Sequence, residues 1–259
     1  MVNKAYYNEI DPYCAAWLRN LIDAGHIARG DVDERSIIEI RADDLRGYTQ
    51  CHFFAGIGGW SYALRLAGWD DTRFVWTGSC PCQPLSVAGK GLGTRDERHL
   101  WPEWFKLIAE CRPVRIFGEQ VASKDGLAWF DIVSTDLETE SYAIGAVDLC
   151  AAGVGAPHIR QRLWFVADAD SNRRQVRRIG QDGLAALPGQ EGDQTQRSCR
   201  SSWADLEWLP CLDGKARPVE SSTFPLAHGI PGRVGRLRAY GNAIVPQAAV
   251  EFIRAVTWR

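Results

Sequence analysis

Residues 78–86 read GSCPCQPLS, and Cys82 is the residue in this stretch that could do the most chemistry. Pro81 and Pro84 flank Cys82 and Gln83 and stiffen the turn that carries the thiol. An exposed cysteine at the end of a strand, close to a following helix, can have a lowered pKa and act as a nucleophile. A free cysteine is more often a small buried hydrophobe, and Cys80, on the strand side of Pro81, fits that role better.

Metal binding and disulfide formation are the two competing roles for this pair. The 259 residues contain eight cysteines and five histidines, which are scattered along the chain. Structural zinc sites usually combine two close Cys or His pairs, and only one C-x-C occurs here. Because the dense cysteine framework of small secreted proteins is also missing, we expect a reducing, cytoplasmic environment and no metal site.

Two more stretches carry residues suited to chemistry. Phe54, Ala55, Gly56, Ile57, Gly58 and Gly59 follow the apolar run QCHF, where glycines allow close approach of a cofactor, although an ordinary tight turn explains them equally well. Glu119 follows VRIF and Gly118, where partial desolvation would raise its pKa and let it donate a proton. A cap for the next helix is the structural alternative for Glu119.

The elements that position these residues alternate along the chain. Asp11 and Pro12 predict the start of a helix that Gly25 ends, after a short strand that carries Glu9 at its end. QCHFF, RFVWTG, VRIF and RLWFVA predict further strands, with helices between them. This order predicts an α/β fold with a Rossmann-like, mostly parallel sheet, in which the ends of the strands converge on one cleft.

The alternation stops near Asp168. Residues 168–235 are rich in Gly, Gln, Ser, Pro and charge and predict a small irregular lobe with a flexible linker. Residues 236–259 return to order, because Ala249, Phe252, Ile253 and Val256 share one helical face. We therefore expect a catalytic domain over 1–167, the lobe over 168–235, and a C-terminal segment that rejoins the catalytic domain.

The charge balance excludes a general polycation. The formal net charge is −2 and the sequence pI is about 6.2, so nucleic-acid binding requires a local patch. RRQVRR at 173–178, followed by Arg197 and Arg200, is a candidate patch or a solvated loop. No long apolar run predicts a membrane span, and the first residues do not predict export.

Five motifs together resemble those of the cytosine-5 DNA methyltransferase family: FFAGIGGW, PCQPLS, GEQV, HIRQRLWFVA and YGNAIVPQ, in the family's order. The resemblance implies S-adenosylmethionine as cofactor and double-stranded DNA as partner. The interval between the glycine stretch and PCQ is too short for the family's next two cofactor motifs. NEIDPYCAAWL and GDVDERSI resemble them, so the resemblance implies a permuted chain whose second and third sheet units precede the first.

The resemblance also implies a role for each matching residue. Cys82 would add to C6 of a flipped-out cytosine, Glu119 would act at N3, and Arg160 and Arg162 would brace the nucleotide and its phosphate. The cofactor residues would be Phe54, Ala55, Gly56, Ile57, Gly58, Gly59, Glu9, Ile10, Asp31, Pro81 and Asn242. Gln83, Ser86, Arg160, Arg162, Arg233 and Arg236 would contact the nucleic acid.

Three departures from the family's pattern keep other functions open. His52 stands where Asp is common, Gln120 where Asn is usual and His158 where Gln begins the arginine motif. The alternatives are a tRNA cytosine-5 methyltransferase, another cytosine-modifying relative, and a non-catalytic DNA-binding homologue. A monomer is the default expectation for an enzyme that clamps DNA, and the short lobe would suit a phage or mobile element. The recognition sequence and any restriction partner stay open.

Overall fold

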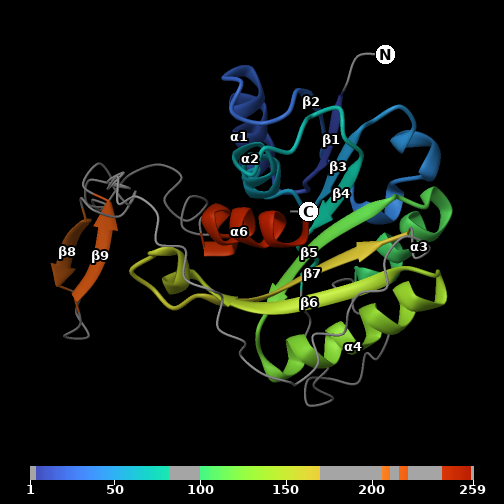
Figure 1. Ribbon diagram of the computed structural model, residues 1–259. Helices are drawn as coiled ribbons and strands as arrows, with labels where there is room; N and C mark the ends of the chain where they lie inside the picture. Colours follow the sequence, from blue (N-terminus) through green and yellow to red (C-terminus); the bar gives the residue numbers. More distant parts are fainter. Residues whose placement is uncertain (1–3, 82–99, 170–205, 211–215, 221–240, 258–259) are drawn as a thin grey trace, which may run out of the picture.

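The protein is described from a computed structural model that covers residues 4–81, 100–169, 206–210, 216–220 and 241–257. Seven strands form one twisted sheet in the order β2-β1-β3-β4-β5-β7-β6, and a separate two-stranded sheet pairs β8 with β9 (Figure 1). The large-sheet strands are β1 Ala5–Asn8, β2 Gly30–Asp33, β3 Gln50–Phe53, β4 Val75–Gly78, β5 Arg115–Val121, β6 Ala143–Cys150 and β7 Gln161–Asp168. The small sheet contains β8 Leu206–Pro210 and β9 Ala216–Glu220.

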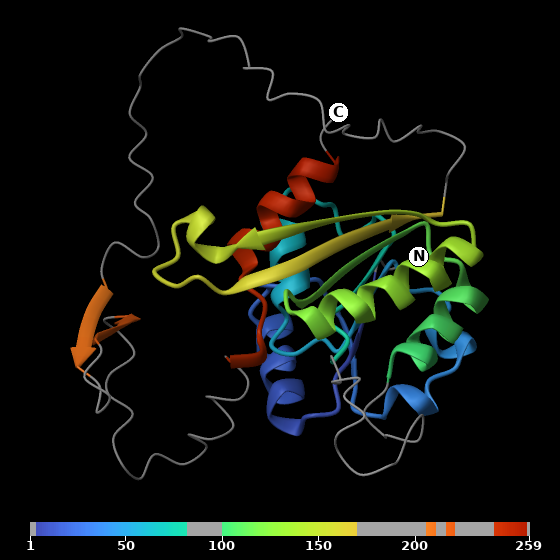
Figure 2. The same cartoon turned by 90° about the horizontal axis from the view of Figure 1, so that it is seen from below.

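Helices cover both faces of the large sheet, which gives three layers (Figures 1 and 2). One face is covered by α1, α2 and α6, and the other by α3 and α4. Their bounds are α1 Pro12–Asp23, α2 Gly59–Leu66, α3 Trp101–Cys111, α4 Lys124–Thr139 and α6 Pro246–Thr257. Short 3-10 helices span η1 Ile37–Glu39, η2 Ala42–Leu45 and η4 Ala151–Val154. The predicted α/β fold with a mostly parallel sheet is confirmed.

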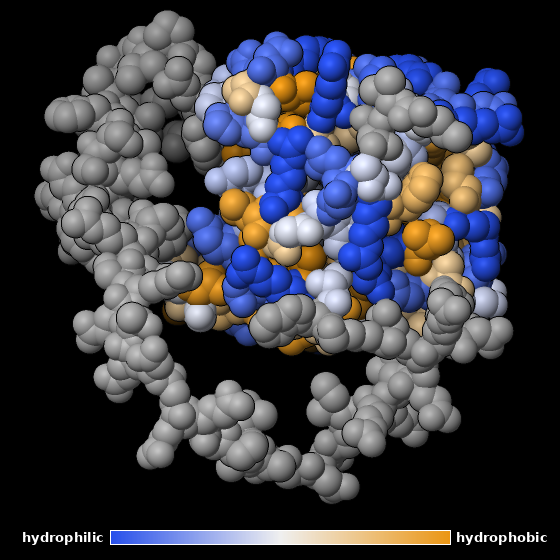
Figure 3. Space-filling model, turned by 45° about the horizontal axis from the view of Figure 1, so that its top comes forward, coloured by the Kyte–Doolittle hydropathy of each residue, from blue (hydrophilic) through white to orange (hydrophobic). Residues whose placement is uncertain are grey.

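Alternating side chains in the central strands fill two apolar cores. Phe117 of β5 and Trp164 of β7 pack with α2 and α6. The residues adjacent to them in each strand, Ile116 and Phe165, pack with α3 and α4. This alternation follows from the two-residue repeat of a strand that is buried on both faces. Hydrophobic and hydrophilic residues are interspersed on the face of the described residues seen in Figure 3.

Local signals in the sequence set the helix ends. Asp11 caps α1 by accepting from the backbone N–H groups of Tyr13 and Cys14, and Pro12 takes the first helical position as predicted. The C-terminal helix α6 buries Ala249, Phe252 and Ile253 on the predicted face. It packs on α2, the helix that follows the glycine stretch.

The structure differs from the sequence analysis at three elements. β5 does not stop at VRIF but runs to Val121, so Glu119 lies within the strand. The extension is stabilised by β7, which pairs with β5 in the antiparallel direction. Strand β6 was not predicted, because most of it is partly or fully exposed and it has no apolar alternation. The small lobe, predicted as irregular, contains the antiparallel β8–β9 pair.

Candidate functional site

The strand ends meet at a cavity of about 440 Å³. β1, β2, β3, β4 and β5 run parallel, so their carboxyl ends lie at the same edge of the sheet. Crevices at this edge are where open α/β sheets bind ligands. The residues that line the cavity and follow or end these strands include Asn8, Glu9, Ile10, Arg35, Ser36, Phe54, Gly56, Ser79, Cys80, Pro81, Glu119 and Gln120.

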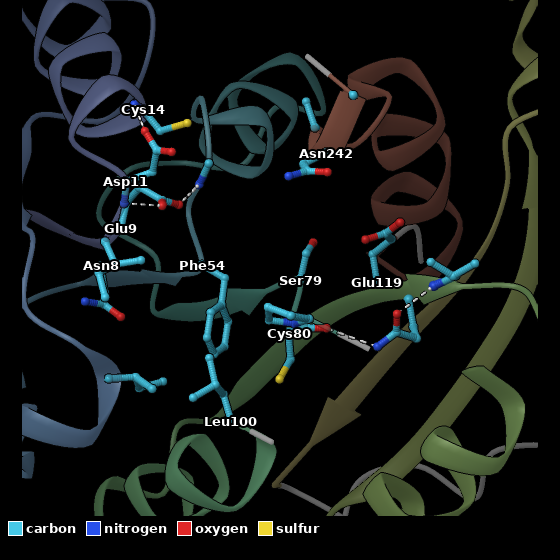
Figure 4. Close-up of a pocket in the computed structure, with 18 of the residues that line it drawn as sticks. Asn8, Glu9, Asp11, Cys14, Phe54, Ser79, Cys80, Leu100, Glu119 and Asn242 are labelled. Atoms are coloured by element: carbon cyan, nitrogen blue, oxygen red, sulfur yellow. Dashed lines mark hydrogen bonds between the residues drawn. The ribbon is translucent and has the colours of Figure 1, made fainter. Parts of the chain in front are cut away.

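Glu9 anchors one side of the cavity (Figure 4). Its Oε1 accepts from the backbone N–H of Asp11 at 2.9 Å, and its Oε2 accepts from the backbone N–H of Gly56 at 2.7 Å. The carboxylate therefore joins the start of α1 to the glycine stretch, 47 residues further along the chain. Backbone amides of this kind favour the charged form of a carboxylate and leave lone pairs for other donors.

The glycine stretch makes a left-handed turn between β3 and α2. Phe54, Gly56 and Gly58 have φ angles of 51°, 55° and 83°, which a side-chain-bearing residue such as Phe54 adopts only under strain. Phe54 and Gly56 line the cavity, and Ile10, which follows Glu9, lines it with 65% of its surface exposed. Thus the predicted cofactor residues at the ends of β1 and β3 come together.

Four of the predicted cofactor residues lie elsewhere. Ala55 is buried in the core beside α1, where its N–H donates to the carbonyl oxygen of Asn8. Ile57, Gly58 and Gly59 line a second cavity of about 580 Å³ between α1, α2 and the start of α6.

Glu119 lies on the opposite side of the first cavity from Glu9, with Phe54 and Ser79 between them in the view of Figure 4. Its side chain is almost fully buried, and this burial raises the pKa of the Glu119 carboxyl above its usual value. The positive charges of Arg162 and Arg160 and a hydrogen bond from Ser79 act in the opposite direction. A carboxyl group with a raised pKa is better able to donate a proton to a ligand.

Arg162 reaches Glu119 because β7 is antiparallel to its neighbours β5 and β6. The antiparallel register pairs Val121 with Arg162, so the amino end of β7 lies at the carboxyl ends of the other strands. Arg162 Nε is 2.8 Å from Glu119 Oε1. The structure therefore brings together Glu119 and Arg162, two of the residues predicted to be catalytic.

The segment after β4 forms the wall between the two glutamates. Cys80 is buried, as expected for the cysteine on the strand side of Pro81, and its carbonyl oxygen accepts from Gln120 Nε2 at 3.0 Å. Ser79 Oγ accepts from Trp60 Nε1 at 3.1 Å, which ties this wall to α2. Pro81 lines the cavity as predicted. Cys82, Gln83, Ser86, Arg233, Arg236 and the basic stretch 173–178 lie outside the described residues.

Asn242 and Arg160 come to the cavity from other parts of the chain. Gly241, Asn242 and Ala243 precede α6 and line the cavity, as the sequence predicted for Asn242. Arg160 precedes β7 and lines both cavities. Its Nη2 donates to the carbonyl oxygens of Gly241 and Ala243 at 2.9 and 2.7 Å.

Asp31, like Ala55, is a predicted cofactor residue that lines neither cavity. It lies opposite Tyr6 within β2, and its carboxylate accepts from the Tyr48 hydroxyl at 2.7 Å and forms an ion pair with Lys4. Strand β2 continues to Asp33, so the residues that reach the cavity are Arg35, Ser36 and Ile37. The residues that follow β2, rather than Asp31 within it, therefore lie at the cavity.

His52, the departure before the glycine stretch, faces the core rather than the cavity. It is buried between Thr77 Oγ1 at 2.8 Å and Gln50 Oε1 at 3.3 Å, and its ring stacks on Tyr7. Burial lowers the pKa of His52 to about 3, so the ring is neutral at pH 7. This position holds strands β3 and β4 together.

Asn8 and Ser79 are site residues that the sequence analysis missed. Asn8 is buried at the end of β1 and donates to the carbonyl oxygen of Arg35 at 2.8 Å, which shapes the turn after β2. Both residues directly adjoin a predicted strand end, and this position was the signal available to find them. No group of three metal-ligating side chains occurs among the described residues, and none of their helices could span a membrane.

Comparison with known proteins identifies the family. Residues 70–196 match the family described as C-5 cytosine-specific DNA methylase. The chain is 25% identical over 169 residues to the type II methyltransferase M.HhaI of Haemophilus parahaemolyticus, covering 50% of this chain and 52% of the relative. It is 36% identical over 106 residues to M.NgoMIV of Neisseria gonorrhoeae, covering 39% of this chain and 33% of the relative. Residues 70–196 therefore carry a domain of the C-5 cytosine-specific DNA methylase family.

The matches extend over only part of these proteins. The chain spans about half or less of the length of the curated relatives that it matches. Among solved structures, a DNMT2 mutant of Spodoptera frugiperda aligns with 16% identity and a TM-score of 0.43, covering 73% of this chain and 56% of that chain.

Proposed function

We propose that the protein is a DNA cytosine-5 methyltransferase that uses S-adenosylmethionine. The observation that carries this proposal is the single cavity with an amide-anchored carboxylate, Glu9, on one side and a buried carboxyl group, Glu119, on the other. Pro81, the residue before Cys82, lies in its wall. DNA is the proposed substrate because the matching family is described as a DNA methylase.

The residues present fit the cofactor. Glu9 keeps lone pairs for ribose hydroxyls, and exposed Ile10 beside it offers an apolar surface for the adenine ring. Phe54 and Gly56 line the cavity, and Pro81 and Asn242 would complete its wall. The turn after β2, with Ser36 and Ile37, takes the position first given to Asp31. When bound, S-adenosylmethionine supplies an electrophilic methyl group.

Cys82 and Glu119 divide the chemistry on the base. The Cys82 thiolate would add to C6 of cytosine, because sulfur is both a strong nucleophile and a good leaving group. Glu119 would deliver its proton to N3, so the electron pair displaced by the addition makes C5 nucleophilic without leaving charge on the ring. After C5 has been alkylated, a water molecule would take the C5 proton and the thiolate would leave. N3 would return its proton to Glu119, which restores the neutral aromatic ring and the acid.

Arg162 holds the Glu119 carboxyl group in place for this step. Its guanidinium contacts Glu119 Oε1, and the Ser79 hydroxyl also hydrogen-bonds the carboxyl group. The base must leave the duplex to reach the cavity, because C6 is inaccessible within a stacked helix. Gln83, Ser86, Arg233 and Arg236 stay the proposed contacts to the nucleic acid, together with the lobe at 168–235.

The order of the sheet units supports a permuted chain. The strand that carries Glu9, β1, lies between β2 and β3, although both β1 and β2 precede the glycine stretch in the sequence. Because β1 and β3 are neighbours in the sheet, Glu9 contacts Gly56 directly. A sheet depends on which strands are neighbours, so this rearrangement keeps the cavity intact.

Mass analysis of nucleosides tests the proposal directly. Duplex DNA incubated with the protein and S-adenosylmethionine should yield 5-methylcytosine, and Cys82→Ala should abolish it. Cys80→Ala is the matched control, because Cys80 is buried and its carbonyl group, which contacts Gln120, is kept. Equal loss in both variants would remove Cys82 as nucleophile.

Two further experiments separate the alternatives. Competition between duplex DNA and tRNA, with analysis of each product, distinguishes the two substrates. A covalent complex with DNA that contains 5-fluorocytosine requires a working nucleophile and donor, so its formation excludes a non-catalytic homologue. Methylation of tRNA alone would contradict the proposed substrate but keep the chemistry.

A further inference from the structure

Arg160 connects two parts of the chain that are far apart in sequence. Its Nη2 bridges the carbonyl oxygens of Gly241 and Ala243, which lie 81 and 83 residues away. One guanidinium nitrogen thus holds both ends of a three-residue segment whose middle residue is Asn242. The planar guanidinium can donate to two acceptors at once in a fixed geometry, which a lysine ammonium on a flexible chain does not reproduce.

The environment of Arg160 differs from that of a surface phosphate contact. Its Nε is buried and has no hydrogen-bond partner among the described residues. Burial, together with the charge of Arg162, lowers the pKa of the guanidinium. Arg160 lines both the 440 Å³ and the 580 Å³ cavities, as Ala243 does. The side chain is therefore a wall element between them.

Ile244, the residue after the segment that Arg160 holds, is in direct contact with the end of the glycine turn. A Cβ atom added at Gly59 would lie 2.7 Å from Ile244 Cγ1. The first residue of α2 is therefore packed tightly against the chain before α6. The apolar face of α6 fixes the helix itself on α2. Gly241 and Ala243 precede α6, and their carbonyl oxygens accept hydrogen bonds from Arg160.

We propose that Arg160 is a positioning residue for the cofactor side of the cavity, in place of the nucleotide contact predicted from the sequence. It fixes the wall formed by Gly241, Asn242 and Ala243 against the glycine turn, while Arg162, two residues further on, serves Glu119. The inference rests on the proposed function, because it concerns the affinity of the same cofactor site.

Calorimetric titration of S-adenosylmethionine into the free protein tests this role. Arg160→Lys should raise the cofactor Kd about five-fold or more and Arg160→Ala about ten-fold or more, since one or both carbonyl contacts are lost. Arg162→Lys is the matched control and should change the Kd less than two-fold while lowering the turnover number. Unchanged affinity in Arg160→Lys and Arg160→Ala would overturn the inference.

Hydrogen exchange separates a failure of the inference from a failure of the proposed function. Without any cofactor, amides in peptides covering 241–247 should exchange faster in Arg160→Lys than in the wild-type protein and in Arg162→Lys. Exchange that is equal in all three proteins would overturn the inference. If the wild-type protein bound no S-adenosylmethionine but exchange still rose, the proposed cofactor would be wrong and the positioning role would stand.

The salt dependence of DNA binding tests the competing role. A lost phosphate contact lowers the slope of log affinity against log salt by about 1. We expect the same slope for Arg160→Ala and the wild-type protein. A slope lowered by about 1, with unchanged cofactor affinity, would overturn the inference and restore the predicted contact with the nucleic acid.

Discussion

The two sides of the cavity hold the same residue type in opposite environments. Glu9 lies at the end of β1 and is held by backbone N–H groups, whereas Glu119 is buried at the end of β5 beside Arg162. Amide donors stabilise a carboxylate, but burial favours the neutral acid. We therefore propose that their environments, and not their residue type, suit Glu9 to cofactor binding and Glu119 to proton transfer.

Replacing the buried acid should have the largest effect. Glu119→Gln keeps the shape and an acceptor for Arg162 but cannot donate a carboxyl proton. We expect methyl transfer to fall by about 10²- to 10⁴-fold, the usual contribution of a general acid. Single-turnover kinetics with cofactor titration checks this result. A variant with weak cofactor binding and normal turnover would reverse the roles given to the two sides.

Although Glu119→Gln should lose activity, it should gain stability relative to the wild-type protein. The pKa of Glu119 is raised in the folded protein, so its protonated form is favoured and its stabilising contribution is lost as pH rises through that pKa. Glu119→Gln should therefore gain stability relative to the wild-type protein as pH rises from 4 to 7. Urea unfolding at these pH values measures the difference, and a relative loss would contradict the raised pKa.

Glu9→Gln should weaken cofactor binding by about 10- to 100-fold, because a hydrogen bond to a charged group contributes about 1.5–3 kcal/mol. The new amide would also place an N–H group against the N–H of Gly56 or Asp11. Calorimetry gives the Kd, and turnover at saturating cofactor should stay within a few-fold of the wild type. A larger loss of turnover than of cofactor affinity would contradict the division of roles between Glu9 and Glu119.

Buried His52, which lies away from the cavity, should make its own contribution to the pH dependence of the unfolding free energy. Its pKa falls from about 6.5 in the unfolded chain to about 3 in the folded protein, so its contribution to stability is present above pH 6.5 and is lost as pH falls. One proton corresponds to about 1.4 kcal/mol per pH unit. His52→Asn should lower the slope of unfolding free energy against pH by this amount between pH 6 and 4.5. An unchanged slope would show that the ring is protonated in the folded state.

Ser79→Ala should give the smallest effect. Ser79 lowers the pKa of Glu119 as a hydrogen-bond donor and accepts from Trp60 Nε1. Its removal should change turnover less than about ten-fold, the cost of about one hydrogen bond, and should move the Glu119-dependent limb of the pH–rate profile to higher pH. Ser79→Thr should restore the wild-type limb. A limb that moved to lower pH would contradict the donor role.

Much of the local structure could be predicted because its signals are local. The Asp11–Pro12 cap, the glycine turn after an apolar strand and the apolar face of α6 depend on neighbouring residues. The convergence of Glu9, Phe54, Pro81 and Glu119 also follows from one rule, that parallel strands end at the same edge of the sheet. These residues could be placed near one another without knowing the strand order.

The remaining features depended on partners that are distant in the sequence. The RLWFVA pattern predicts β7 but not its direction, and only the antiparallel pairing with β5 brings Arg162 to Glu119. The same holds for Asp31, whose partners Lys4 and Tyr48 come from other parts of the chain.

The sequence by itself determined the residue types, the strand and helix alternation and the family. The tertiary structure decided which of two arginines, separated by one residue, serves the acid and which holds the chain before α6. The physical reason is that a side chain's role depends on its acceptors, and those of Arg160 lie more than 80 residues away. Contacts of that range follow from strand pairing and packing, which local sequence patterns do not encode.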